Sequence, residues 1–393
     1  MPAKKVLPIS DPRVYATTHH SSLLAILFAN PESYPWIYSN YIQQFTLKNL
    51  YESNRTGTLE FFIDHYGDYE VLEHRICPMI RFSRIPKEVA AALPGSTLDF
   101  LKQMISFGHY IYCTFDTYYI AAWRSGQHNP HMNLLYGFDD EDQVFYSGDN
   151  YSNGKYSFLQ IPYAQVEASM NSYMNGGILD QSEGFELLQY RSPYDRPHYK
   201  GDPSKIVHSQ EMLRLKLGKM IDDIRGFLLT PDQSYRIFAA SAAESNELVL
   251  RLAQNHAAEP QIVRYEFLDS PLYAFGIAQY AVLREYVEAV ITHADPYIDA
   301  RAVSSVCDHK RLMLSRLAFI NEYYPLPNYK ELTDQNQSLY ETASQIQSLC
   351  VKYNITKRPP ILFKIQRFYE EMELRDRLFM EALASSLLSV LSR

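Results

Sequence analysis

The spacing of the apolar residues changes near Pro203, and this change divides the chain. Before it, short runs rich in β-branched and aromatic residues predict strands, as in residues 109–115. The prolines between residues 192 and 203 interrupt any regular element. After them, apolar residues recur at helical spacing in five long segments, residues 206–229, 272–293, 299–323, 339–353 and 360–391. We therefore predict an α+β domain with an antiparallel sheet in residues 1–195, followed by an all-α helical domain in residues 203–393.

The composition is that of a globular protein that does not bind nucleic acid. Of the 393 residues, 46% are hydrophobic and 21% are charged, and the formal net charge is −8. No basic stripe that would bind phosphates occurs in the sequence. No apolar run is as long as a membrane span, and the first residues lack the apolar core of a signal peptide. We therefore expect a cytoplasmic protein that binds neither nucleic acid nor membrane.

A predicted hairpin brings a histidine and an aspartate together. Residues 131–138 and 143–147 have the pattern of two strands, with a turn at residues 139–142. His131 begins the first strand and Asp149 follows the second, and these two ends of an antiparallel pair lie about 5 Å apart. A carboxylate bonded to one ring nitrogen of a histidine leaves the other nitrogen as a general base. The spacing alone also fits a surface histidine beside a turn, because Asp and Asn are ordinary turn residues.

The amino-acid sequence of this hairpin resembles that of a known family. The run HMNLLYGFDDEDQVFYSGDNY, residues 131–151, is similar to the His-strand-Gly-Tyr/Phe-Asp-turn-strand-Asp signature of papain-like cysteine peptidases. It resembles most closely the BtrH-type acyltransferases of antibiotic biosynthesis, over about residues 15–190, and the preceding FDTYYI also fits. The resemblance implies a papain-like fold, with His131 as general base and Asp149 as its orienting partner. It also implies transfer of an acyl group from a carrier-protein thioester to a small-molecule amine.

The chain departs from this family at the nucleophile. Papain-like enzymes carry a cysteine on the first turn of the first long helix, where the helix dipole stabilises a thiolate. The corresponding turn here holds no cysteine, and its nearest oxygen nucleophiles are Ser21 and Ser22. A serine at this place is either a nucleophile that His131 must deprotonate or a cap of the helix. Cys77, in a predicted strand before a proline, and Cys113 are expected to be buried thiols.

Four further residues are predicted to bind substrate. His20 lies at the mouth of the first helix, Trp36 belongs to an aromatic run that would line a cleft, and Asp116 and Tyr118 come from the segment that the resemblance covers. We expect no cofactor, because the chain has no Gly-rich phosphate loop.

Two further sets of polar residues contain histidine. His19, His20, His128 and His131, with Asp149, could form a metal site, but a spacing of three in a loop does not place two rings on one face. We therefore predict no metal. In the helical half, residues 308–313, DHKRLM, are expected to form a solvated helix face rather than a site.

Two functions remain open from the sequence. The first is acyl transfer or acyl hydrolysis by a Ser/His/Asp variant of the papain-like triad, with an acyl- or peptidyl-carrier protein as partner. The second is a catalytically degraded homologue that binds an assembly-line enzyme as a scaffold, a reading that the missing cysteine favours. The sequence predicts no particular oligomeric state.

Overall fold

The chain forms two compact units, each built from separate stretches of sequence. The structure, a computed structural model, describes residues 2–52, 59–62, 77, 79–93, 95–151, 154–181, 184–192, 210–228 and 273–391. The first unit comprises Met1–Tyr34 and Val71–Val207, and the second comprises Pro35–Glu70 and His208–Arg393. Along the chain, the last change from the first unit to the second falls between Val207 and His208, close to the predicted boundary. Residues 193–203 themselves lie outside the described residues. Pro35–Glu70, which we placed in the first domain, groups instead with the helices.

The first unit is built on a seven-stranded sheet in which every pair is antiparallel. The strands are ordered β4-β9-β5-β6-β7-β8, and β1 pairs with the C-terminal part of β6. Their bounds are β1 Lys4–Val6, β4 Ile80–Ile85, β5 Tyr110–Asp116, β6 Pro130–Asp139, β7 Val144–Asp149, β8 Ser157–Pro162 and β9 Phe185–Tyr190. The α+β class with an antiparallel sheet is thereby confirmed.

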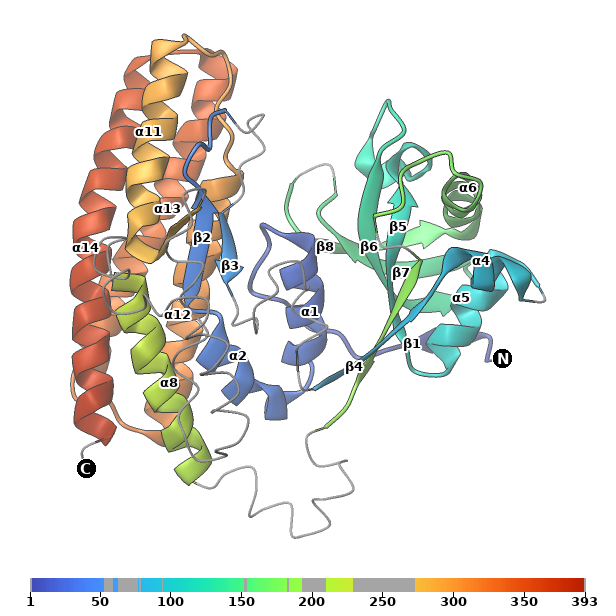
Figure 1. The fold of residues 1–393 in the computed structure, drawn as a ribbon, viewed down its shortest axis with the longest axis horizontal. Helices are drawn as coiled ribbons and strands as arrows, with labels where there is room; N and C mark the ends of the chain where they lie inside the picture. The colour runs from blue at the N-terminus through green and yellow to red at the C-terminus, as the bar shows by residue number, and fades with distance from the viewer. Residues whose placement is uncertain are drawn as a thin grey trace, which may run out of the picture. The chain divides into compact units, whose positions relative to one another are not determined.

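Helices cover both faces of this sheet. Helix α1 lies against one face, and α4, α5 and α6 lie against the other (Figure 1). Their bounds are α1 Thr18–Phe28, α4 Lys87–Ala92, α5 Thr97–Ser106 and α6 Tyr163–Met174, with short 3₁₀ turns at η1 Pro31–Ser33, η2 Thr117–Tyr119 and η3 Ala121–Trp123. The central strand β5 is therefore buried along its whole length.

Local sequence explains where several of these elements begin and end. Helix α5 starts at a capping box, in which the Ser96 hydroxyl accepts from the Asp99 amide and the Asp99 carboxylate accepts from the Ser96 amide. Helix α6 ends before Gly176, whose φ of +74° is the left-handed conformation that terminates helices. At Gly137 a Cβ atom would lie 2.8 Å from the Lys5 carbonyl oxygen, so glycine there lets β1 reach β6.

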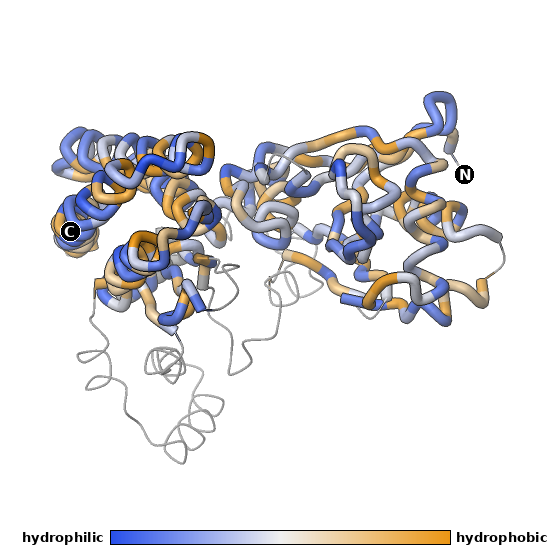
Figure 2. Tube along the Cα trace, turned by 90° about the horizontal axis from the view of Figure 1, so that it is seen from above, coloured by the Kyte–Doolittle hydropathy of each residue, from blue (hydrophilic) through white to orange (hydrophobic). Residues whose placement is uncertain are grey.

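The second unit consists of long helices and a small sheet. Its three strands are ordered β10-β2-β3, with bounds β2 Gln43–Leu47, β3 Leu59–Phe62 and β10 Tyr273–Phe275. Its helices are α2 Tyr34–Asn40, α8 Gln210–Leu228, η7 Gly276–Ala278, α11 Gln279–Thr292, α12 Arg301–Tyr323, α13 Tyr329–Thr356 and α14 Pro360–Leu391. Hydrophobic and hydrophilic residues alternate along the helices (Figure 2), as expected for helices that bury one face.

Residues 35–47 pack with the helices because α12 supplies donors for their carbonyl groups. The fully buried Arg316 guanidinium donates to the Tyr38 and Tyr41 carbonyl oxygens, each at 2.7 Å. His309 Nε2 donates to the Ile42 carbonyl oxygen at 2.8 Å. Tyr38 lies in the last turn of α2, where an α-helix leaves carbonyl groups without internal partners, and Tyr41 and Ile42 follow the helix.

The polar cluster 308–313 is therefore not the solvated face that the sequence suggested. Asp308, His309 and Lys310 are all buried. Lys310 Nζ lies 2.6 Å from both carboxylate oxygens of Asp376 on α14, and Tyr280 Oη donates to the same carboxylate at 2.8 Å. Buried charges require such partners, so this cluster holds α11, α12 and α14 together.

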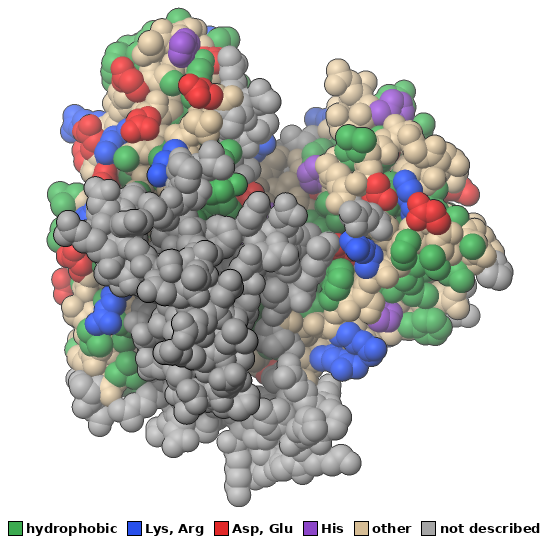
Figure 3. Space-filling model, in the orientation of Figure 1, with side chains coloured by type: hydrophobic (Ala, Val, Ile, Leu, Met, Phe, Trp, Pro, Cys, Tyr) green, Lys and Arg blue, Asp and Glu red, His purple; other side chains and the backbone are tan. Residues whose placement is uncertain are grey.

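Acidic and basic side chains are interspersed over the described surface on the face drawn in Figure 3. Among the helices of the described ranges, none combines the length and apolar composition needed to cross a bilayer.

Candidate active site

The predicted histidine–aspartate contact is present at one end of the sheet. His131 is the second residue of β6 and Asp149 is the last residue of β7, and Leu134 pairs with Gly148 between them. His131 Nδ1 lies 3.2 Å from Asp149 Oδ2. The Asp149 side chain is fully buried, whereas 35% of the His131 side chain is exposed. The pair thus presents its imidazole to solvent and keeps its carboxylate inside.

The Asp149 side chain accepts hydrogen bonds from three segments. Thr18 Oγ1, on the first turn of α1, donates to Oδ1 at 3.1 Å, and the Asn150 amide donates to the same oxygen at 2.6 Å. Asn133 Nδ2 donates to Oδ2 at 3.0 Å, beside the His131 nitrogen. A carboxylate oxygen accepts hydrogen bonds and donates none. Asp149 therefore accepts from His131, which must carry its proton on Nδ1.

A chain of hydrogen bonds fixes Asn133 in the orientation that this requires. The Ser147 hydroxyl donates to Asn133 Oδ1, and the Tyr151 hydroxyl donates to Ser147 Oγ at 2.8 Å. Because Oδ1 is an acceptor in this chain, the amide nitrogen of Asn133 faces Asp149. The sequence analysis did not identify these residues, since a polar residue inside a strand carries no signal of its partners.

Asp149 also sets the protonation of His131. Burial lowers the pKa of His131, but the hydrogen bond to Asp149 and the charge of Asp149 outweigh it, and the pKa is raised above its ordinary 6.5. The Met132 carbonyl oxygen, 3.0 Å from Nδ1, acts in the same direction. Within the described residues Nε2 has no hydrogen-bond partner, so it is the nitrogen that can accept a proton from a ligand.

Trp123 covers the His131 ring. The centroids of the two rings lie 4.4 Å apart, and Tyr151 lies 5.9 Å from the indole. Trp123 ends η3 in the loop between β5 and β6. The indole Nε1 is buried and has no acceptor among the described residues. Sequence reasoning missed this residue, although a tryptophan close before a candidate base is a usable signal.

The structure does not bring either predicted serine nucleophile to His131. The buried Ser21 hydroxyl lies 2.8 Å from the Val14 carbonyl oxygen and 2.7 Å from that of Thr17, and it donates to these acceptors. Ser22 Oγ lies 3.0 Å from Tyr156 Oη, and both side chains are buried. Burial raises the pKa of Tyr156 well above its ordinary value, so this hydroxyl is not a base for Ser22.

The cysteines do not replace Ser21 and Ser22 as nucleophiles. All four, Cys77, Cys113, Cys307 and Cys350, are buried free thiols, and the burial of Cys77 and Cys113 agrees with the sequence prediction. Burial raises the pKa of Cys113, which opposes thiolate formation.

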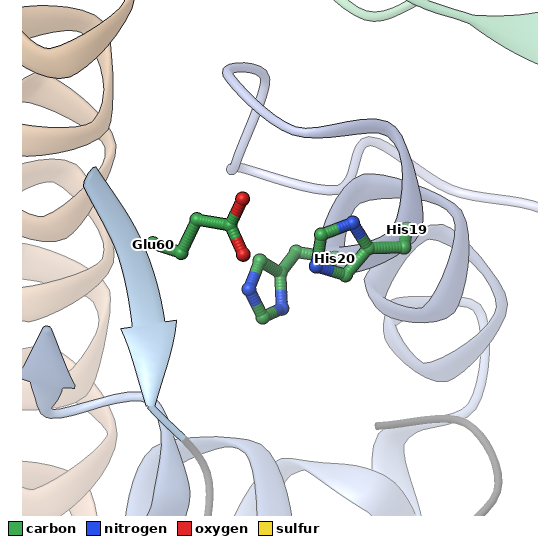
Figure 4. Close-up of side chains that lie close together, drawn as sticks. All are labelled: His19, His20 and Glu60. Atoms are coloured by element: carbon green, nitrogen blue, oxygen red, sulfur yellow. The ribbon is translucent and has the colours of Figure 1, made fainter. Parts of the chain in front are cut away.

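The four predicted substrate-binding residues are scattered. Asp116 and Tyr118 lie together at the end of β5, where the fully buried Asp116 accepts from the Tyr118 amide at 3.2 Å. His20 is fully buried on the first turn of α1, with its ring centroid 4.2 Å from that of His19 (Figure 4). Trp36 belongs to α2 of the helical unit, where it packs edge-on against Tyr41.

The histidines are held in different places. His128 Nδ1 lies 2.7 Å from Asp116 Oδ2, whereas His131 is bound to Asp149. Glu60, the third residue drawn in Figure 4, is on β3 and belongs to the helical unit. The metal site considered from His19, His20, His128 and His131 is therefore not assembled within the first unit.

No protein-family model matches the chain, and no curated protein matches it significantly. The function has to be argued from the site.

Proposed function

We propose that the first unit is a papain-like acyltransferase-type site in which His131, oriented by Asp149, acts as general base. The contact between His131 Nδ1 and the buried Asp149 carboxylate supports this proposal, together with the open Nε2. This is the arrangement by which a carboxylate fixes the tautomer of a catalytic histidine. General-base assistance of this kind contributes roughly 10²–10⁴-fold to a rate.

The positions of Ser21 and Ser22 favour direct transfer over a covalent acyl-enzyme. In direct transfer, His131 Nε2 takes the proton of the acceptor amine as its nitrogen attacks the donor carbonyl carbon. The new C–N bond forms, the C–S bond of the thioester breaks, and the imidazolium returns its proton to the leaving thiolate. Atoms and charges balance without a protein nucleophile.

The substrate class rests on the resemblance of residues 131–151 to BtrH-type acyltransferases. On that basis the donor is an acyl thioester on an acyl- or peptidyl-carrier protein, and the acceptor is a small-molecule amine. With water as acceptor the same site would hydrolyse the thioester. A cytoplasmic location fits such partners and is part of the proposal.

Thioester turnover tests this proposal. The full-length protein is incubated with S-acetyl and longer S-acyl N-acetylcysteamine thioesters and a panel of amines, and thiol release and amide formation are followed. We expect His131→Ala and Asp149→Asn to lose at least tenfold of the rate, and Ser21→Ala to retain it. We expect no acyl adduct on the intact protein by mass spectrometry. A serine acyl adduct that disappears in Ser22→Ala would refute direct transfer in favour of a covalent mechanism.

The alternative is a binding or scaffold protein that retains the fold and has lost catalysis. The engaged hydroxyls of Ser21 and Ser22 favour it, because neither is presented to a base. Absence of turnover with the wild-type protein, together with equal binding of an acylated carrier protein by wild type and His131→Ala, would support the scaffold and contradict the enzyme.

A further inference from the structure

A second histidine–aspartate pair, His128 with Asp116, lies in the same unit. Asp116 is fully buried and 48% of the His128 side chain is exposed. Asp116 Oδ2 accepts from Ser172 Oγ at 2.6 Å and lies 2.7 Å from His128 Nδ1, while Oδ1 accepts from the Tyr118 amide. A carboxylate oxygen accepts hydrogen bonds, so His128 donates to it through Nδ1.

The two pairs lie on opposite faces of the sheet. Phe115 pairs with His131 and Asp116 pairs with Pro130, and successive residues of a strand point to opposite faces. Ser172, which donates to Asp116, is on α6, whereas Thr18, which donates to Asp149, is on α1. These helices cover different faces (Figure 1). The His128–Asp116 pair is therefore not part of the His131 site.

One loop nevertheless contains His128 and contacts His131. Residues 117–129 connect β5 to β6, and the loop is closed at its base by the Asp116 to His128 bond and by the Thr117 amide donating to the Asn129 carbonyl oxygen at 3.0 Å. Near this base Tyr118 stacks on the His128 ring, with centroids 4.2 Å apart.

Further along the same loop, Trp123 lies on His131. Its indole covers the ring at 4.4 Å, and its buried Nε1 has no acceptor among the described residues. A buried donor without an acceptor costs free energy, so other contacts of the loop must hold the indole in this place. Gln165 of α6 contributes one such contact, because its Oε1 accepts from the Ala121 amide at 3.0 Å.

We propose that His128 and Asp116 are positioning residues for the His131 site, which hold the loop of residues 117–129 so that Trp123 covers the imidazole of the general base. The catalytic meaning of this role rests on the proposed function. The positioning itself does not, because it can be read from Trp123 directly.

The indole provides a spectroscopic test. Trp36 and Trp123 are the two tryptophans of the chain, so Trp36→Phe leaves Trp123 as the sole emitter. An indole in contact with an imidazole is quenched when the imidazole is protonated. In this background we expect Trp123 emission to rise with pH in one transition, and His131→Gln to abolish the transition.

The proposal predicts that His128→Ala and Asp116→Asn each lose at least half of the amplitude of this pH transition in Trp123 emission. Both variants should also raise the acrylamide quenching constant of Trp123 at least twofold, with unchanged far-ultraviolet circular dichroism. His128→Asn is the matched control, because its amide nitrogen can donate to Asp116 as Nδ1 does but does not titrate. We expect His128→Asn to retain the transition, which it could not do if His128 itself were the quencher.

An unchanged transition and unchanged acrylamide quenching in His128→Ala would overturn the proposal, as would loss of the transition in His128→Asn. Should His128→Ala not fold, Ser172→Ala removes one donor of Asp116 and should raise acrylamide quenching in the same direction, and no change there would also overturn it. Turnover distinguishes the two proposals. Fluorescence as expected without thioester turnover refutes the enzyme and leaves the positioning role, whereas turnover with unaltered Trp123 fluorescence in His128→Ala refutes only the positioning role.

Discussion

The buried ion pair of Lys310 and Asp376 gives the sharpest energetic prediction for the helical unit. Both side chains are fully buried, and Nζ lies 2.6 Å from each carboxylate oxygen. Lys310→Met removes the ammonium and leaves Asp376 with the Tyr280 hydroxyl as its remaining described donor. An uncompensated buried charge costs roughly 3–5 kcal/mol. Asp376→Asn should cost a similar amount, because it leaves the Lys310 ammonium buried without a counter-charge.

The double variant separates the charge from the packing. Lys310→Met with Asp376→Asn buries no net charge, so it should recover about 2 kcal/mol or more relative to the sum of the single variants. The control is the exposed pair Arg367 and Glu371, which lies on α14 as Asp376 does. Glu371→Gln should cost no more than about 0.5 kcal/mol of stability.

Urea unfolding measured through Trp36 reports on this unit alone. In a Trp123→Phe background, Trp36 is the sole tryptophan, and it lies on α2 of the helical unit. Single variants that cost less than about 1 kcal/mol, or a double variant that costs the full sum, would show that this ion pair is not what compensates the buried charges.

Two further predictions concern ionisation. Asp149→Asn removes the charge and the charged hydrogen-bond partner that raise the pKa of His131. It leaves burial, which lowers the pKa more strongly than the Met132 carbonyl raises it, so the pKa should change from above 6.5 to below 6.5. In the wild type the raised pKa stabilises the fold at pH values below about 6.5, and this contribution is lost as the pH rises through the folded-state pKa. In the variant, protonation of His131 should destabilise the fold instead of stabilising it. The pKa of His131 can be measured from its imidazole resonances by NMR, and a value at or above 6.5 in the variant would contradict this reasoning. Burial raises the pKa of Cys307 and of Cys350 to about 12, so at pH 8 their thiolate fraction should fall on the order of 10³-fold below that of the unfolded chain. Ellman's reagent should therefore modify neither thiol in the native protein, and modification of either at the unfolded rate would show that it is accessible.

The elements that sequence reasoning predicted well are those with local causes. Residues 360–391 were predicted as a helix and form α14 with these bounds, because an amphipathic period persists over many turns. The hairpin of β6 and β7 and the contact of His131 with Asp149 followed from a short turn and from strand geometry.

What sequence reasoning missed depends on partners far away in the chain. Phe45 pairs with Phe275, a separation of 275 − 45 = 230 positions, and this pairing places residues 35–70 with the helices. His309 and Lys310 were expected on a solvated face because charged residues are rarely buried. Their acceptors, the Ile42 carbonyl and Asp376, come from other parts of the chain, and no local pattern announces them.

The same contrast bears on His131, the proposed general base. Asp149 accepts hydrogen bonds from Thr18 of α1, Asn133 of β6 and Asn150 after β7, so the fold orients its side chain before any ligand binds. The tautomer of His131 is fixed by that side chain, and it would be fixed in a scaffold as well as in an enzyme. What an enzyme additionally needs is a controlled environment around Nε2, and the neighbour of the imidazole that offers it is Trp123. In the proposed enzyme, the loop that carries Trp123 therefore matters more than a further hydrogen bond to Asp149 would.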